Sequence, residues 1–295
     1  MPIRIGINPI TWSNDDLLEL GGDTPLETCL AETREAGYAG IELGNKFPRE
    51  STVLRPILDR HGLALVSGWY SGRLLERTAA EEIGAVEAHL RLLSDMGSAV
   101  MVFAETTGSV AGARATPVTR RPRLTEAQWP VLAERLTGVA DHLAKRGVRM
   151  AYHHHMGTVI ETEAEIDRLM ASTGDSVGLL LDTGHLTYAG ADPAAVARCH
   201  IARLNHVHCK DVRPAVLAAM RRGDRSFLDS VVEGVFTVPG DGAVDFSAVL
   251  DILKAAQYRG WLVVEAEQDP AKAHPLTYAR MGYRNLSDAA RAAGF

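Results

Sequence analysis

The sequence predicts an α/β fold, a single (β/α)₈ barrel in which eight parallel strands alternate with helices. Three observations support this prediction: the length of the chain, a unit that recurs along it, and polar residues that follow the expected strands. Barrels of this kind occupy about 250 residues as one domain, so residues 1–295 are expected to form a single domain. The composition, with 46% hydrophobic and 23% charged residues, is that of an ordinary globular protein.

The recurring unit is an amphipathic stretch that ends in a turn at or near a glycine, followed within a few residues by a short apolar run. This order is typical of a junction between a helix and a strand. It occurs at residues 35–43, 60–68, 95–103, 145–152 and 255–265. Further apolar runs at residues 4–9, 176–182 and 203–208 bring the expected strands to eight, the number that closes this barrel.

Two connections are longer than the others, at residues 106–124 and 211–245, and the second contains a predicted short helix at residues 215–222. Both follow expected strands, where long loops usually shape or cover an active site. The alternative architecture is an open, doubly wound sheet. The first expected strand is not followed by the Gly-x-Gly-x-x-Gly pattern that nucleotide-binding sheets of that kind carry.

Polar residues follow each expected strand in turn. In chain order they are Asn8; Glu42, Asn45 and Lys46; Trp69; Glu105; His153, His154, His155 and Glu161; Asp182 and His185; His208 and Lys210; and Glu265 and Glu267. In a barrel of parallel strands all eight carboxyl ends meet at one face, and catalytic groups gather there. These residues are therefore the candidates for an active site.

Three of these residues form a candidate metal site. Side chains alternate along a strand, so His206, His208 and Lys210 share a face, and Cys209 points away from it. If Asp182, His208 and Glu265 all point to the barrel axis, they offer two carboxylates and an imidazole, which suit Mn²⁺, Co²⁺ or Mg²⁺, with Zn²⁺ as a further candidate. A bound cation would offset the cost of burying these charges together.

The fourth metal ligand has two candidates, Glu161 and His153. A third carboxylate better matches a hard cation, so Glu161 is preferred. By alternation, His153 and His155 share the inward face, while His154 is expected to be structural.

The candidates for proton transfer are Glu161, His185 and Lys210. For His185 and Lys210 the alternatives are a histidine paired locally at a helix start and a surface lysine paired with Asp211. The candidates for substrate contact are Asn8, Glu42, Lys46, Trp69, Glu105, His153, His155 and Glu267.

Charge and cysteine content exclude several classes of function. The net charge of −6 argues against nucleic acid as a partner, since a phosphate backbone requires a concentrated basic surface. The three cysteines form neither a CxxC pair nor an even set, so a disulfide framework and a cysteine zinc site are not indicated. The N-terminal residues do not resemble a leader, and no apolar run reaches about 18 residues. We therefore expect a cytoplasmic protein without membrane contact, compatible with a homo-oligomer.

The residues around these strand ends resemble the xylose isomerase-like barrel superfamily and, within it, the inosose dehydratases of myo-inositol catabolism. The resemblance runs from end to end. Its most distinctive segments are GINPITWSNDD (6–16), LGGDTPLETCL (20–30), GIELGNKFPR (40–49), YHHHMGTVIET (152–162), LLLDTGH (179–185), HVHCKDVR (206–213) and VPGDGAVDF (238–246). LDTGH and the final glutamate are shared widely in the superfamily, whereas GINPITW, GNKFPR and YHHHMGT are narrower.

The resemblance implies a lyase that dehydrates a polyhydroxylated ketone, 2-keto-myo-inositol (scyllo-inosose), to a trihydroxycyclohexane-dione. It also implies a divalent metal such as Mn²⁺ or Co²⁺ on Asp182, His208 and Glu265, and glutathione as a cofactor. Where much of the superfamily has a glutamate, this chain has His153. The alternative on the same metal site is a sugar or inosose isomerase or epimerase, because an enediolate can be reprotonated as readily as it expels hydroxide.

Overall fold

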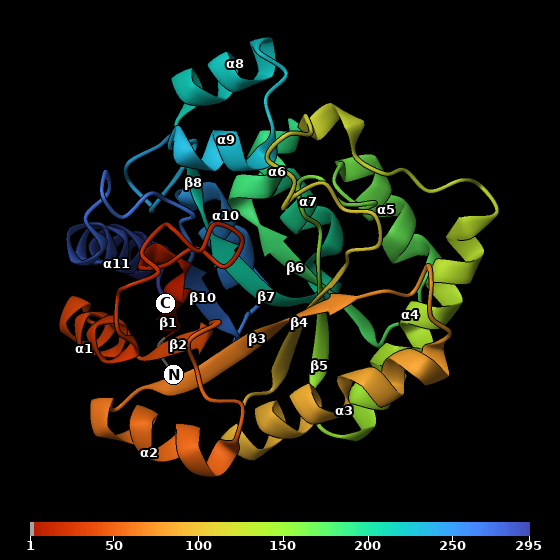
Figure 1. Ribbon diagram of the computed structural model, residues 1–295, viewed down its shortest axis with the longest axis horizontal. Coiled ribbons are helices and arrows are strands. Elements are labelled where there is room, and N and C mark those ends of the chain that lie inside the picture. The colour runs from red at the N-terminus through yellow and green to blue at the C-terminus, as the bar shows by residue number, and fades with distance from the viewer. Residues whose placement is uncertain (1–2) are drawn as a thin grey trace.

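The computed structural model describes residues 3–295 and contains a closed barrel of eight parallel strands with helices around it (Figure 1). The barrel strands are β1 (Arg4–Ile7), β2 (Gly40–Leu43), β3 (Ala64–Gly72), β4 (Val100–Glu105), β5 (Arg149–His153), β6 (Val177–Asp182), β7 (Leu204–Cys209) and β10 (Trp261–Val264). Each lies beside its neighbour in sequence order, and β1 pairs with β10 to close the barrel. The predicted fold class is confirmed. Met1 and Pro2, the start of the expected domain, lie outside the described residues.

The outer ring of helices encloses the strands (Figure 1). It consists of α1 (Leu26–Ala36), α2 (Ser51–His61), α3 (Ala79–Met96), α4 (Gln128–Lys145), α5 (Glu163–Ser172), α7 (Pro193–His200), α10 (Phe246–Ala255) and α11 (Pro275–Ala292). Helices α1 and α3 end at Gly37 and Gly97, whose φ angles of 107° and 77° lie in the left-handed region that favours glycine. These glycines belong to the helix-to-strand junctions that the sequence predicted.

The core lies in two layers. The larger layer packs the helices against the outside of the barrel. Inside the barrel, one cluster contains Val100, Val102, Ala151 and Leu180, and another contains Val66, Trp261 and Val263. Ala151, Leu180 and Val263 each stand two positions before a polar residue, namely His153, Asp182 and Glu265. Because alternate residues share a face, the apolar floor of the barrel directs those three side chains inward.

The connection at residues 211–245 is more structured than expected. It contains α8 (Pro214–Arg222), which confirms the predicted helix, and also α9 (Phe227–Val232) and an antiparallel pair of β8 (Asp211–Val212) with β9 (Phe236–Thr237). The Asp211 carboxylate accepts hydrogen bonds from the backbone N–H groups of Gly240, Gly242 and Val244. A separate apolar cluster that includes Phe227 and Phe236 packs this segment over the carboxyl ends of the strands.

The remaining short elements are α6 (Thr183–Ala189) and the 3₁₀ turns η1 (Pro9–Thr11), η2 (Val118–Arg120) and η3 (Ile201–Arg203). In residues 3–295, no helix combines the length and apolarity that crossing a bilayer would require.

Candidate metal centre and active-site cavity

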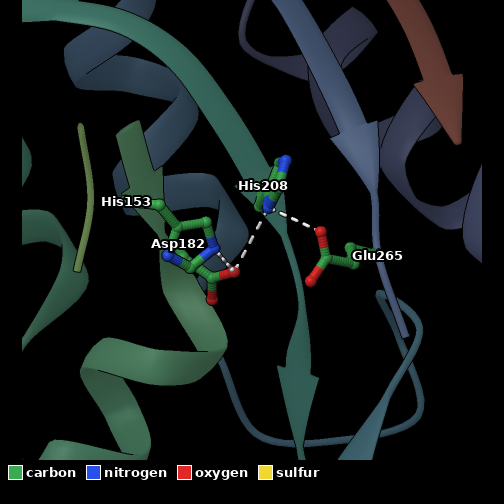
Figure 2. Close-up of side chains that lie close together, drawn as sticks. All are labelled: His153, Asp182, His208 and Glu265. Atoms are coloured by element: carbon green, nitrogen blue, oxygen red, sulfur yellow. Dashed lines mark ion pairs between the residues drawn. The ribbon is translucent and has the colours of Figure 1, made fainter. Parts of the chain in front are cut away.

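Four side chains from four neighbouring strands point toward one another at the carboxyl end of the barrel (Figure 2). They are His153 at the end of β5, Asp182 at the end of β6, His208 in β7 and Glu265 after β10. Each offers one ligand atom, and these four atoms lie within 4.8 Å of one another. Asp182 Oδ2 is 3.4 Å from His153 Nε2 and 3.5 Å from His208 Nδ1, which is 2.6 Å from Glu265 Oε2.

This group fits a divalent cation. Asp182 Oδ2 and His208 Nδ1 are buried and have no hydrogen-bond partner among residues 3–295, even though His208 Nδ1 lies close to Glu265. Leaving such an atom unsatisfied costs about 1–3 kcal/mol, so an atom of this kind is expected to bind something. Two imidazole nitrogens and two carboxylates form a mixed set that suits Mn²⁺, Co²⁺ or Zn²⁺.

The electrostatics of the group also favour positive charge. Burial by itself lowers the pKa of His208, but Glu265 and Glu42 outweigh it and raise that pKa well above its usual value. Burial would raise the pKa of Asp182, yet Lys210 and His185 hold it well below its usual value. A place that so strongly favours a proton on His208 will also favour a metal cation.

Asp182 serves two purposes with its two oxygens. Oδ1 caps helix α6 by accepting a hydrogen bond of 2.8 Å from the backbone N–H of His185, while Oδ2 faces His153 and His208. The cap fixes the direction of the carboxylate, because only one orientation satisfies the helix end. The local sequence Asp-Thr-Gly-His thus builds both the helix start and one corner of the group.

The structure does not bring Glu161, the preferred fourth ligand, into this group. Glu161 lies in the connection after β5, where Oε1 is 3.2 Å from Nε of the buried Arg121 and Oε2 accepts a hydrogen bond of 2.8 Å from Gly157 N–H. Arg121 also binds both oxygens of Glu165, at 2.7 and 2.9 Å. The carboxylate of Glu161 is therefore engaged in holding a loop, and the fourth member of the group is His153. The physical reason is that His153 ends the strand itself, whereas Glu161 is eight residues beyond it.

Lys210 is completely buried beside the group. Its Nζ lies 2.7 Å from both Glu265 Oε1 and Glu267 Oε1 and 3.0 Å from His185 Nε2. Burial alone would lower the pKa of Lys210, but these glutamates outweigh it and hold the pKa above its usual value. The side chain is thus a buried ammonium group, which rules out the surface pairing with Asp211.

Glu42 contacts the far side of His208. It accepts hydrogen bonds from His206 Nε2 at 2.8 Å, His208 Nε2 at 3.2 Å and Asn8 Nδ2 at 2.7 Å, and another from Ser67 Oγ. Burial would raise the pKa of Glu42, but the two histidines hold it well below its usual value. Glu42 therefore orients His208 so that Nδ1 faces Asp182 and Glu265.

A cavity of about 280 Å³ opens above the group. Its walls include six of the eight residues predicted to contact substrate: Asn8, Glu42, Trp69, His153, His155 and Glu267. His154 lies outside the cavity, as expected for a structural residue. It is fully buried, and its Nε2 accepts a hydrogen bond of 3.3 Å from Asp182 N–H.

The structure does not bring Lys46 and Glu105 to the cavity. The Lys46 ammonium donates to the backbone carbonyls of Gly21, Gly22 and Thr24. Glu105 shares the outer face of β4 with Phe103, which packs in the layer between barrel and helices, and its carboxylate accepts from the N–H groups of Leu74 and Thr107. Both side chains hold loops, and neither lines the cavity.

Several residues of the cavity were not predicted. They are Asp15 and Asp16 after η1, Ser71 at the end of β3, Thr106 and Ser109 in the 106–124 connection, and Thr158 after β5. The adjacent carboxylates, which begin eight residues after the first strand, were a visible signal. The serine and threonine hydroxyl groups gave no such signal, because these residues are common in any loop.

Comparisons with known proteins agree with the fold. The model of the xylose isomerase-like TIM barrel family matches residues 30–288. The rhizopine catabolism protein MocC of Rhizobium meliloti is 56% identical over 100% of this chain and 91% of its own length. An inosose dehydratase of Geobacillus thermodenitrificans is 46% identical over 94% of both chains.

Two solved structures share the fold at low sequence identity. The IolI protein with a bound zinc atom has a TM-score of 0.71 at 18% identity, and the match covers 98% of this chain and 99% of that one. A sugar phosphate isomerase/epimerase of Parabacteroides distasonis has a TM-score of 0.70 at 14% identity, over 98% and 96%. At such identities the likeness extends to the fold alone.

Proposed function

The chain belongs to the xylose isomerase-like TIM barrel family, and we propose that it is a metal-dependent hydro-lyase that removes water from 2-keto-myo-inositol (scyllo-inosose) in inositol catabolism. The product is a trihydroxycyclohexane-dione. The observation that carries the proposal is the group of His153, Asp182, His208 and Glu265 at the base of a polar cavity. The choice of substrate is supported by the name of the Geobacillus relative, which is 46% identical over 94% of the chain.

The same four residues would hold the metal, for which Mn²⁺ and Co²⁺ are proposed, with Zn²⁺ or Mg²⁺ as alternatives. A divalent cation held there would act as a Lewis acid on a ketone and make its α-proton easier to remove. The sequence resemblance also implies glutathione, but no contact described above points to a glutathione site.

Lys210 and Glu267 are the proposed catalytic pair. Glu267 lines the cavity, and the fully buried Lys210 ammonium, which does not line it, lies 2.7 Å from Glu267 Oε1. We assign Glu267 as the acceptor of the α-proton and Lys210 as the buried cation behind Glu267 and Glu265, whose charge stabilises the developing enediolate. Glu267 then returns this proton to the β-hydroxyl, which leaves as water, and the resulting enol tautomerises to the dione.

His185 and Glu161, the other two predicted catalytic residues, take positioning roles in this proposal. His185 Nε2 lies 3.0 Å from the Lys210 ammonium, and the backbone N–H of His185 donates to Asp182 Oδ1, so His185 orients both residues without lining the cavity. Glu161 holds Arg121 and the connection at residues 106–124. Neither is assigned a proton transfer.

The reaction is tested by incubating metal-reconstituted protein with scyllo-inosose and following mass and ultraviolet absorbance. Dehydration lowers the mass by one water and creates a conjugated, enolised dione that absorbs in the ultraviolet. A product of unchanged mass without a new chromophore would instead identify the isomerase or epimerase activity. Unchanged substrate in the presence of stoichiometric metal would rule out both activities.

The 56% identity to MocC adds rhizopine catabolism as a second setting for the same chemistry. Comparing kcat/KM for scyllo-inosose and for a rhizopine, measured on the same preparation, would separate the two settings. The cytoplasm is the proposed place of action, supported by three free cysteines, of which Cys29 and Cys209 are buried.

A further inference from the structure

The walls of the cavity have an unusual charge distribution. Five carboxylates line it, from Asp15, Asp16, Glu42, Glu265 and Glu267, and four hydroxyl groups, from Ser71, Thr106, Ser109 and Thr158. Among the lining residues within 3–295, none is a lysine or an arginine. The fold alone does not dictate this charge distribution, because the Parabacteroides protein with the same fold is named a sugar phosphate isomerase/epimerase.

Three of the five carboxylates have cationic partners. Glu42 is hydrogen-bonded to two histidines, and Glu265 and Glu267 each lie 2.7 Å from the Lys210 ammonium. The negative charge of these three carboxylates is therefore compensated at the base of the cavity. These paired charges contribute little electrostatic field at the entrance, because the fields of two opposite charges a few ångströms apart largely cancel farther away.

Asp15 and Asp16 are not compensated in this way. Both side chains are exposed at the entrance, and a carbon built on Gly112 would lie 3.7 Å from Asp16 Oδ1, so that carboxylate faces the 106–124 connection across the opening. Partial desolvation and the neighbouring Asp16 raise the pKa of Asp15 to about 6, and desolvation and Glu267 raise that of Asp16. Arg49 is a cation that partly opposes this rise in the pKa of Asp15.

A ligand for this cavity is indicated independently of the two aspartates. His208 lines it, is 2% exposed, and carries a buried Nδ1 without a hydrogen-bond partner among residues 3–295. Asp15 and Asp16 line the same cavity, so a substrate that reaches this atom shares the space with their carboxylates. Proteins that bind phosphate or carboxylate groups usually supply arginine, lysine or a helix N-terminus, and here the lining supplies carboxylates and hydroxyls.

We propose that Asp15 and Asp16 make the cavity selective by charge, so that it accepts uncharged polyhydroxy ketones and rejects phosphorylated or carboxylated ones. This inference rests on the proposed function, since it concerns the substrate of the same site. Repulsion acts over about 8 Å at physiological salt, which covers an anionic group at the entrance of the cavity. The hydroxyl groups of Thr106, Ser109 and Thr158 donate to backbone carbonyls, so their oxygens can still accept hydrogen bonds from the hydroxyls of an uncharged ring.

The test compares two probes on the metal-loaded protein by titration calorimetry: myo-inositol, which is uncharged, and a myo-inositol monophosphate. In the unchanged protein the phosphate is expected to bind more weakly. In Asp15→Asn/Asp16→Asn the ratio of the two dissociation constants should shift toward the phosphate by about tenfold at low salt. The shift should shrink as salt is added.

The matched control is Glu19→Gln/Asp23→Asn, which removes the same charge from exposed residues of the same connection that do not line the cavity. Here the ratio should not change. The inference would be overturned if both double variants shifted the ratio equally or if Asp15→Asn/Asp16→Asn did not shift it. It would also be overturned if the unchanged protein bound the phosphate more tightly or bound neither probe. Water loss from scyllo-inosose is measured in parallel. If the ratio of dissociation constants shifts but scyllo-inosose is not dehydrated, only the proposed function is overturned. If scyllo-inosose is dehydrated but the ratio does not shift, only this inference is overturned.

Discussion

Oε1 of Glu42 lies 3.2 Å from Nε2 of His208, on the side of the imidazole ring opposite the nitrogen that faces Asp182 and Glu265. A hydrogen bond to one ring nitrogen determines which tautomer is present and leaves the other nitrogen free to bind a metal. Glu42 therefore sets the direction of His208, and we treat it as a positioning residue.

Replacing Glu42 should weaken metal binding. Replacing a residue that holds a metal ligand in place typically lowers metal affinity by about 10–100-fold. The loss in Glu42→Gln should be near the lower value, because the amide oxygen can still accept a hydrogen bond. The loss in Glu42→Ala should be near the upper value. Competition with a chelator measures the dissociation constant. Glu105→Gln is the control, because Glu105 is an equally buried carboxylate whose contacts are loop N–H groups. Equal losses in Glu42→Ala and Glu105→Gln would contradict the role of Glu42.

Replacing Lys210 should remove catalysis without removing the metal. The ammonium contacts Glu265 and Glu267, and its loss takes away the only buried lysine of the described residues. We expect Lys210→Ala to lower kcat by more than about 100-fold while metal content stays stoichiometric. Lys145→Ala, at an exposed position at the end of α4, should have no effect. An unchanged kcat in Lys210→Ala would exclude this residue from the mechanism.

Stability should fall in acid because of buried neutral histidines. Burial lowers the pKa of His154 from 6.5 to about 3, so between these values the unfolded chain binds a proton that the folded chain does not. Stability then decreases as the pH falls, by about 1.4 kcal/mol per unit for one such histidine. His154→Gln should lose about 2 kcal/mol less between pH 7 and pH 5 in denaturant titrations. Identical pH dependence in the two proteins would contradict this reason.

The barrel was predictable because its signal repeats. Each helix-to-strand junction combines a glycine turn with an apolar run, and five such junctions with three further apolar runs give the eight strands even if one boundary is misplaced. Boundaries were less secure: β3 extends to Gly72, so Trp69 lies inside the strand and not after it. The small pair of β8 and β9 was missed because two-residue strands carry no periodicity.

The site was predictable where alternation applied. His208 and Glu265 follow inward-facing strand positions, and Cys209 turns outward into the core as expected. The same rule applied to β4 places Glu105 on the outer face beside Phe103, which is why its side chain does not line the cavity. Glu161 and Lys46 were different. They lie in loops, where only the contacts with Arg121 and with the carbonyls of residues 21–24 determine direction.

The fourth metal ligand can be decided by a pair of substitutions. His153 Nε2 lies 3.4 Å from Asp182 Oδ2, while the Glu161 carboxylate faces Arg121 at 3.2 Å. We expect His153→Ala to weaken metal binding by more than about 100-fold, beyond the range for a residue that only holds a metal ligand in place. Glu161→Gln should leave metal affinity unchanged but lower the free energy of unfolding, since Arg121 loses part of its compensation in a buried place. Chelator competition and denaturant titration on both variants provide the two readouts. The reverse pattern, with metal affinity lost in Glu161→Gln and kept in His153→Ala, would return the fourth position to Glu161 and require the loop after β5 to move when the metal binds.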